Sequence, residues 1–230
     1  MNDSSAERAA LRQSWTANAA AWTTAVREQA IPSRRLATDA AIVAACARVL
    51  DGRRDMRALD VGCGEGWLAR ELATLGAVVT GIDGSAPLID AARASGGEVD
   101  YACVSYDQLE SDASVVEGPF DLVVCNFALL DDRTGPLLAA LARRLPASGV
   151  ILVQTVHPWA AVGEGPYEEG WRTETWGAFG KAFPSPMPWY FRPIGSWLAA
   201  AREAQLVVDR LEEPIHPETR KPLSLLLELC

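Results

Sequence analysis

Three alternate glycines, Gly62, Gly64 and Gly66, follow directly after a short apolar run that contains Asp60. Glycine permits positive φ angles and carries no Cβ atom, so a turn of this composition lets a ligand lie against the main chain. A carboxylate just before the glycines suits a ligand with a positive charge, because opposite charges attract strongly in a partly buried site. The spacing therefore predicts a binding turn for a small, partly cationic molecule.

A second acidic residue, Asp83, ends the next apolar run, 23 residues after Asp60. A carboxylate in that position can accept hydrogen bonds from both hydroxyls of a ribose. The dinucleotide fingerprint, counted from Gly62, needs a third glycine where Trp67 stands, so NAD and FAD are disfavoured. A glycine triplet alone also occurs in structural turns, but together with Asp83 it predicts a nucleoside ligand.

His157 is the candidate general base. It follows an apolar run at the edge where open parallel sheets bind ligands, and imidazole titrates in a range suited to proton abstraction. The alternative is a structural role in a His-Pro turn, in which the imidazole of His157 donates a hydrogen bond to a backbone carbonyl. The other histidine, His216, lies in a proline-flanked loop and is expected to be structural.

Residues 157–194 are rich in tryptophan, proline and glycine, too irregular for a strand-helix unit and too aromatic for a linker. We expect a structured lid over the sheet, with Trp159 as a substrate contact, although aromatic residues are more often core. Arg192 could pair with an anionic substrate or with a structural carboxylate. The charged run 131–133 is expected to form a solvated turn.

The elements that must position these residues alternate between short apolar runs and helical patterns from Ala58 onward, which is typical of a parallel sheet with helices on both faces. The predicted strands are 58–61, 78–82, 99–103, 120–126, 150–156, 206–211 and 223–229. Two helices, 6–30 and 36–50, precede the sheet and are expected to lie across its open end.

We expect one domain over residues 1–230, because the length suits a single core. Its expected parts are an N-terminal helical cover (1–50), a cofactor-binding core (51–156), the Trp-rich lid (157–194) and a C-terminal helix with strands (195–230).

The composition of the chain argues against several classes of protein. Lys and Arg total 21 against 30 Asp and Glu, a formal net charge of −9, which disfavours nucleic acid as a partner. No apolar stretch is long enough to cross a membrane, and no basic region with an apolar run opens the chain. The five cysteines form no CxxC pair, which argues against a zinc site or disulfide framework. We expect a cytoplasmic protein without a metal.

The runs Leu59–Gly66, Val79–Asp83 and Phe120–Val124 resemble successive motifs of the class I S-adenosylmethionine-dependent methyltransferases. The stretch Leu59–Asp83 is particularly similar to the ubiquinone-biosynthesis O-methyltransferases, and residues 190–193 resemble a bacterial small-molecule branch more loosely. The resemblance covers about residues 30–156. It implies an α/β fold, a Rossmann-like seven-stranded, mostly parallel sheet with helices on both faces and an antiparallel last strand.

The resemblance also implies residue roles. The glycines would line the methionine and ribose portions of the cofactor, and Arg35, or Arg34 beside it, would reach the cofactor. Ser105 is not the acid that many relatives use for the adenine, so Asp107 or a backbone group would take that part. The expected cofactor contacts are Arg35, Asp60, Gly62, Cys63, Gly64, Gly66, Asp83, Gly84, Ser105, Tyr106 and Asn126. The expected substrate contacts are Trp159, Tyr190 and Arg192.

These observations predict an enzyme that transfers a methyl group from S-adenosyl-L-methionine to an oxygen or nitrogen of a small molecule, leaving S-adenosyl-L-homocysteine. The quinone-like resemblance makes a phenolic acceptor plausible. The chain is expected to act as a monomer or homodimer. The alternative is a non-catalytic S-adenosylmethionine-binding regulatory or partner module, and a nicotinamide-dependent dehydrogenase is a weaker one.

Overall fold

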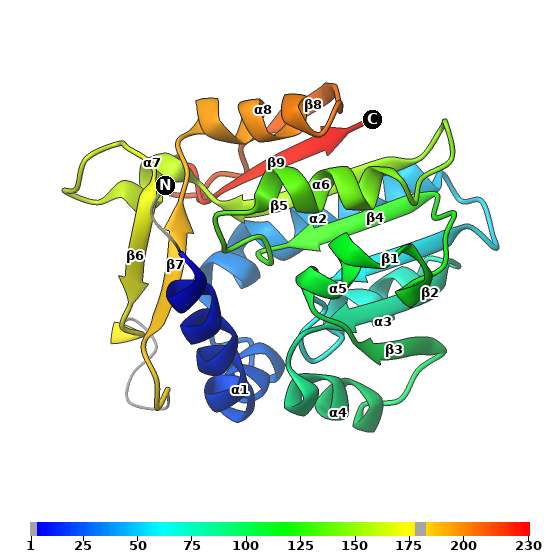
Figure 1. The fold of residues 1–230 in the computed structure, drawn as a ribbon, viewed down its shortest axis with the longest axis horizontal. Helices are drawn as coiled ribbons and strands as arrows, with labels where there is room; N and C mark the ends of the chain where they lie inside the picture. The colour runs from blue at the N-terminus through cyan, green and yellow to red at the C-terminus, as the bar shows by residue number, and fades with distance from the viewer. Residues whose placement is uncertain (1–3, 178–182) are drawn as a thin grey trace.

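The structure is a computed structural model that describes residues 4–177 and 183–230, and its centre is a seven-stranded sheet (Figure 1). The strand order is β3-β2-β1-β4-β5-β9-β8. The strands are β1 (Arg57–Val61), β2 (Val78–Asp83), β3 (Val99–Cys103), β4 (Leu122–Asn126), β5 (Val150–Val156), β8 (Val208–Glu212) and β9 (Ser224–Leu229). Both ends of each strand lie within two residues of the ends predicted from the sequence.

The sheet is mostly parallel and has the predicted antiparallel last strand. Strands β1 to β5 pair in parallel, whereas β9 runs antiparallel to both of its neighbours, with Ile151 opposite Leu229. The strand order reverses between β1 and β4, and the carboxyl ends of these two strands diverge into the loops where open α/β sheets bind ligands. The predicted fold class is confirmed.

Helices cover both faces of the sheet, because side chains of each strand alternate between two apolar layers. The helical segments are α1 (Ser5–Arg27), η1 (Arg34–Thr38), α2 (Asp39–Leu50), α3 (Trp67–Thr74), α4 (Ala86–Ala94), α5 (Tyr106–Ser111), η2 (Ala113–Val115), α6 (Thr134–Ala142), α7 (Pro158–Val162) and α8 (Ile194–Glu203). On β4, Leu122 and Val124 pack with α2 and α3, whereas Val123 and Cys125 pack with α5, α6 and α8.

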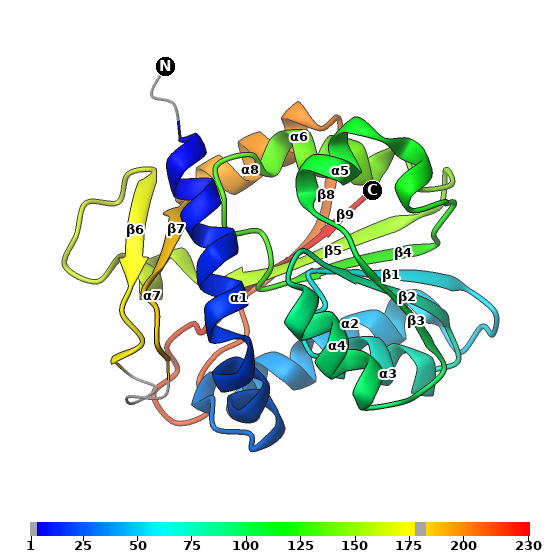
Figure 2. The same ribbon diagram turned by 60° about the horizontal axis from the view of Figure 1, so that its bottom comes forward.

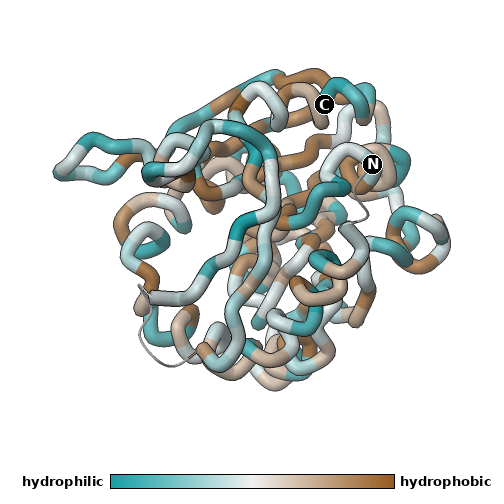
Figure 3. Tube along the Cα trace, turned by 60° about the vertical axis from the view of Figure 1, so that its left-hand side comes forward, coloured by the Kyte–Doolittle hydropathy of each residue, from teal (hydrophilic) through white to brown (hydrophobic). Residues whose placement is uncertain are grey.

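The Trp-rich segment contains α7 and an antiparallel hairpin of β6 (Gly170–Glu174) and β7 (Met187–Phe191), while residues 178–182 lie outside the described part. Helix α1 lies between this hairpin and the sheet (Figure 2). Figure 3 views the molecule from the side of the hairpin, and most residues of the hairpin have polar or intermediate hydropathy. Its apolar contacts with α1 come from aromatic side chains, among them Trp171, Trp176, Phe183 and Trp189.

Candidate active site

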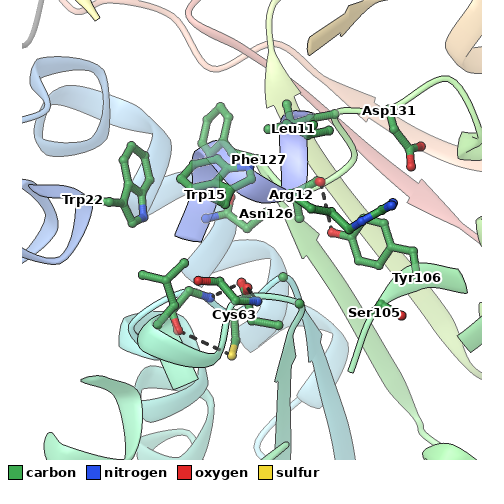
Figure 4. A pocket seen from close by; sticks show the side chains of 18 of the residues that line it. Leu11, Arg12, Trp15, Trp22, Cys63, Ser105, Tyr106, Asn126, Phe127 and Asp131 are labelled. Carbon is green, nitrogen blue, oxygen red and sulfur yellow. Dashed lines mark hydrogen bonds between the residues drawn. The ribbon is translucent and has the colours of Figure 1, made fainter. Parts of the chain in front are cut away.

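A cavity of about 140 Å³ opens at the carboxyl ends of β1 to β4 (Figure 4). Its walls come from the glycine turn, the end of β2, the start of α5, the loop after β4 and one side of α1. It collects eight of the eleven expected cofactor contacts, namely Gly62, Cys63, Gly64, Asp83, Gly84, Ser105, Tyr106 and Asn126.

The three glycines all have positive φ, but they serve different purposes. A Cβ atom on Gly62 would stand 2.5 Å from the Cβ of Ala128, and one on Gly66 would overlap the hydroxyl of Tyr101. These two glycines let the turn pack against the loop after β4 and against the side chain of Tyr101 on β3. A Cβ on Gly64 would meet only the indole nitrogen of Trp22, at 3.6 Å, so Gly64 is the glycine at which a ligand can lie close to the main chain.

Asp83 is fixed at the end of β2 by two backbone donors. Its Oδ1 accepts from the Ser85 N–H at 2.8 Å, and its Oδ2 accepts from the Gly64 N–H at 3.0 Å. Burial raises the pKa of this carboxyl, and the two donors act against that rise. A carboxylate has about four acceptor positions, so capacity remains for two ribose hydroxyls on the cavity side.

Asp60 lies beneath the turn rather than on the cavity wall. It is 2% exposed, and its Oδ2 has no hydrogen-bond partner within residues 4–177 and 183–230. Burial, followed by the nearby charge of Asp83, raises its pKa to about 7. A cationic group held above the turn would stabilise the ionised form. This orphaned acid and the Asp83 carboxylate fit a cofactor that joins a ribose to a sulfonium.

Helix α1 supplies cavity walls that the sequence analysis did not assign. Leu11, Trp15 and Trp22 all line the cavity from one stripe of the helix, at positions i, i+4 and i+11. Three ion pairs fasten the helix to the core: Arg8–Asp132 at 2.9 Å, Arg12–Asp107 at 3.5 Å and Arg27–Glu65 at 3.2 Å. The apolar stripe in the sequence could have indicated the inward face, although not what it covers.

Of the two neighbouring arginines before α2, Arg34 reaches the cavity and Arg35 does not. The Arg34 guanidinium lies 4.4 Å from the centre of the Trp67 ring, and its Nε donates to Asp39 at 2.8 Å. Both arginines lie in a π-helical turn, η1, where the predicted helix 36–50 was expected to begin. The wider turn changes which side chain points inward.

The end of β4 and the first residue of the loop after it, Asn126 and Phe127, also line the cavity. Asn126 Oδ1 accepts from Gln154 Nε2 at 2.9 Å, and the Phe127 N–H donates to the Gln154 carbonyl at 2.7 Å. Phe127 adopts a φ of 53°, a strained value for an aromatic residue. The strain accompanies the abrupt turn that places Phe127 on the cavity wall.

Ser105, Tyr106 and Asp107 begin α5 and line the cavity together. Ser105 caps the helix, since its Oγ accepts from the Gln108 N–H. The Tyr106 hydroxyl donates to the Ala128 carbonyl at 3.0 Å, and Asp107 pairs with Arg133 at 2.9 Å. Because these side chains already have protein partners, main-chain groups at this helix start remain the better candidates for the adenine.

His157 does not line the cavity. Its Nδ1 accepts from the Trp159 N–H at 3.1 Å, its Nε2 lies 2.8 Å from Glu213 Oε1, and the residue is 3% exposed. These are the contacts of a helix cap, because His157 is the residue that precedes α7. The role of general base stays a prediction for His157.

The three expected substrate contacts also lie outside the cavity wall. Trp159 is 54% exposed, with the Lys221 ammonium 5.8 Å from its ring centre. Tyr190 and Arg192 belong to the hairpin side, and Arg192 donates to the Asp131 carbonyl from Nη2 at 3.2 Å. Any effect of Arg192 on a substrate in this cavity would therefore act through the loop that carries Asp131.

Asp131 corrects the expectation of a solvated turn at 131–133. It lines the cavity and is half-buried, and burial is the main reason that its pKa is raised. The hairpin explains the difference. The Tyr190 N–H donates to the Leu130 carbonyl at 2.8 Å, and Arg192 donates to the Asp131 carbonyl at 3.2 Å. A short-range sequence pattern cannot show that a segment sixty residues later covers this loop.

Residues 58–149 match the family model described as "Methyltransferase domain". This part of the chain is therefore similar to methyltransferase domains. The match spans the glycine turn, Asp83, Asn126 and Asp131, and thus most of the sheet side of the cavity.

Curated relatives include the ubiquinone biosynthesis O-methyltransferase of Nitrosococcus oceani, which is 41% identical over 107 residues. That match covers 44% of this chain and 44% of the relative, so the chain spans less than half the length of the curated relatives it matches.

Solved structures show the same fold. The S-adenosylmethionine-dependent methyltransferase of Mesorhizobium loti has a TM-score of 0.61 and 22% identity, covering 80% of this chain and 95% of that one. The 1,6-didemethyltoxoflavin-N1-methyltransferase of Burkholderia thailandensis has a TM-score of 0.63 and 16% identity, covering 100% of this chain and 90% of that one.

No helix in residues 4–177 and 183–230 is long and apolar enough to span a membrane. Within the same ranges, no three His, Cys, Asp or Glu side chains form a group that could hold a metal ion.

Proposed function

We propose that the chain is an enzyme that transfers a methyl group from S-adenosylmethionine to an oxygen or nitrogen of a small molecule. The observation that carries the proposal is the arrangement of two carboxylates around Gly64. Asp83 faces the cavity with acceptor capacity left, and Asp60 lies buried below with one oxygen unpartnered among the described residues. This arrangement suits a ligand with a ribose at one point and a positive charge at another.

S-adenosylmethionine supplies a methyl group already activated by its sulfonium, so the protein's contribution is to position and to shield. Asp83 would hold the ribose, and ionised Asp60 would favour the sulfonium over the neutral product. Trp15 and Phe127 would exclude water from the space above the turn, where the acceptor's nucleophile must lie in line with the methyl group.

A small acceptor is favoured because α1 closes over the cavity. The helix is tied to the core near both of its ends, by Arg8 and by Arg27, so a macromolecular substrate would have to displace it. The names of the relatives support both nucleophiles, since one is an O-methyltransferase of ubiquinone biosynthesis and another an N1-methyltransferase. We propose a phenolic hydroxyl as the first acceptor class to test.

The test is to incubate the chain with S-adenosylmethionine and panels of phenols, catechols and aromatic amines, and to measure S-adenosylhomocysteine. We expect acceptor-dependent product with wild type and with Asp90→Asn, an exposed acid on α4, and strongly reduced product with Asp83→Asn. The non-catalytic alternative has no support among the relatives. It predicts cofactor binding with no product from any acceptor, and that result would contradict our proposal.

We further propose that the protein acts in the cytoplasm, as a monomer or homodimer, without a nucleic acid or membrane partner. Free thiols support the reducing compartment, because all five cysteines lack a disulfide partner. Mass measurement in solution and fractionation of cells that express the chain would test these two points.

A further inference from the structure

Asp131 stands out as a carboxylate on the cavity wall that the binding of a nucleoside does not use. It lies in the loop after β4, five residues beyond Asn126. Figure 4 shows it together with Leu11, Trp15 and Phe127 on the side of the cavity opposite the glycine turn at Cys63. That side is where an acceptor must enter if the cofactor lies against the turn.

The hydrogen bonds around Asp131 leave one of its oxygens free for a ligand. Oδ1 accepts from the Arg133 N–H at 2.9 Å. Two nearby arginines are engaged elsewhere: Arg8 binds both oxygens of Asp132, at 2.9 and 3.1 Å, and Arg192 donates to Thr134 and to the Asp131 backbone carbonyl. Within the described residues, no group donates a hydrogen bond to Asp131 Oδ2.

Apolar and aromatic side chains share the cavity wall with Asp131. Leu11, Trp15, Phe127 and Leu130 line the cavity, together with the charged side chains of Arg8, Arg12 and Asp107. A half-buried carboxylate next to aromatic walls favours a ligand with an apolar ring and a hydrogen-bond donor, because the donor satisfies the acid that the walls desolvate. A second carboxylate in the same place would meet charge repulsion.

We propose that Asp131 is the catalytic residue that accepts a hydrogen bond from the nucleophilic hydroxyl or N–H of an aromatic acceptor and receives its proton. The inference rests on the proposed function. For a hydroxyl acceptor, the oxygen forms the new bond to the methyl carbon with a lone pair. The electron pair of the broken S–CH₃ bond stays on sulfur, which gives S-adenosylhomocysteine, and the acceptor's proton passes to Asp131 Oδ2.

The substitution Asp131→Asn gives a sharp test because it is nearly isosteric. The amide oxygen of the new side chain can keep the bond from the Arg133 N–H, which leaves the NH₂ group facing the cavity. An NH₂ group donates and cannot accept from a hydroxyl. A hydroxyl oxygen can still accept from this NH₂ group, but the charge-assisted bond that the hydroxyl donates to a carboxylate is lost, so the variant should bind hydroxyl ligands more weakly and carboxylates more tightly.

Binding of three monocyclic probes, phenol, toluene and benzoate, reads out this exchange without turnover. We would measure their affinities by ligand-observed NMR at pH 7.5, with and without S-adenosylhomocysteine. Wild type and the control Asp90→Asn should bind phenol about tenfold more tightly than toluene or benzoate. Asp131→Asn should lose about tenfold for phenol and bind benzoate more tightly than wild type does.

Three results would overturn the inference. The first is phenol affinity that is the same in wild type and Asp131→Asn, and the second is benzoate binding to wild type as tightly as phenol. The third is absence of phenol binding in the millimolar range. Failure of the proposed function gives a different result from failure of this inference. If the proposed function is wrong, S-adenosylhomocysteine gives no binding signal in wild type or variant, regardless of how the three probes bind.

The pH profile adds a second readout once an acceptor is turned over. As a base, Asp131 works only when ionised, so kcat should rise with pH through its raised pKa in wild type and lose that rise in Asp131→Asn. A profile that is unchanged in the variant would contradict a base. The charged or titratable groups around Asp131 are Arg8 and Arg12 of α1, Tyr106 and Asp107 of α5, Asp132 and Arg133 of its own loop, Tyr190 of β7 and Arg192.

Discussion

At the scale of single residues, the two carboxylates near the glycine turn differ in what stabilises their charge. Asp83 receives two backbone N–H groups, whereas one oxygen of Asp60 receives none within the described chain. A buried acid with an unpaired oxygen is ionised more readily when a positive charge is near. The sulfonium is therefore the group that Asp60 should recognise.

We expect the ratio of S-adenosylmethionine to S-adenosylhomocysteine affinity to increase several-fold between pH 6 and pH 8 in wild type, because the pKa of Asp60 is raised to about 7 and only the ionised form attracts the sulfonium. Calorimetric titration of both ligands at the two pH values measures the ratio. Asp60→Asn should show a flat, lower ratio. A wild-type ratio that does not change with pH would remove Asp60 from charge recognition.

Sequence reasoning located the glycine turn and Asp83 because their chemistry depends on neighbours along the chain. It chose Arg35 with Arg34 as the second candidate, whereas Arg34 is the one that lines the cavity, since the inward direction depends on the π-helical turn. It also took Asp131 for a solvated residue, because the covering hairpin follows sixty residues later. Contacts that are local in sequence were predictable, and those made by distant segments were not.

At the scale of elements, helix α1 contacts both the β6–β7 hairpin and the glycine turn. Its last turn carries Arg27, which pairs with Glu65, an acid in the glycine turn that is 1% exposed and also paired with Arg70. A helix at this place was predictable from its amphipathic pattern. Its partners were not, because the pattern shows an inward face without showing what that face meets.

Arg27→Ala should loosen the C-terminal half of α1 and weaken S-adenosylhomocysteine binding several-fold, because it removes one of the two arginines on a buried carboxylate. Hydrogen exchange of α1 amides and calorimetry measure the two effects. Arg12→Ala is the matched control, since its pair with Asp107 is exposed on both sides and contributes about 0.5 kcal/mol or less. Equal exchange in the two variants would contradict the coupling.

At the scale of the whole molecule, the parallel sheet with helices on both faces follows from alternating strands and helices, whereas the aromatic layer between α1 and the hairpin does not. That layer joins the first thirty residues to the segment after β5, around Trp15, Trp22 and Trp176. The aromatic layer encloses the site that contains Asp60. Because Asp60 is buried, its ionisation should lower the stability of the fold.

We expect wild type to lose about 1.4 kcal/mol of unfolding free energy, relative to Asp60→Asn, between pH 6 and pH 8. The sign follows from the raised pKa: the folded chain holds the Asp60 proton up to about pH 7 while the unfolded chain has released it, so stability falls as pH rises through that value. Urea unfolding at both pH values measures the difference. Parallel pH dependence in the two proteins would show that Asp60 is not the group responsible.

The central claim is that the turn around Gly64, with Asp83 beside it, binds S-adenosylmethionine and its product. Calorimetric titration of the full chain with S-adenosylhomocysteine tests it most directly. We predict one site per chain in wild type and at least tenfold weaker binding in Asp83→Asn, with both proteins folded by circular dichroism. A folded wild-type chain that gives no binding heat, or an Asp83→Asn variant that binds as tightly as wild type, would contradict the claim.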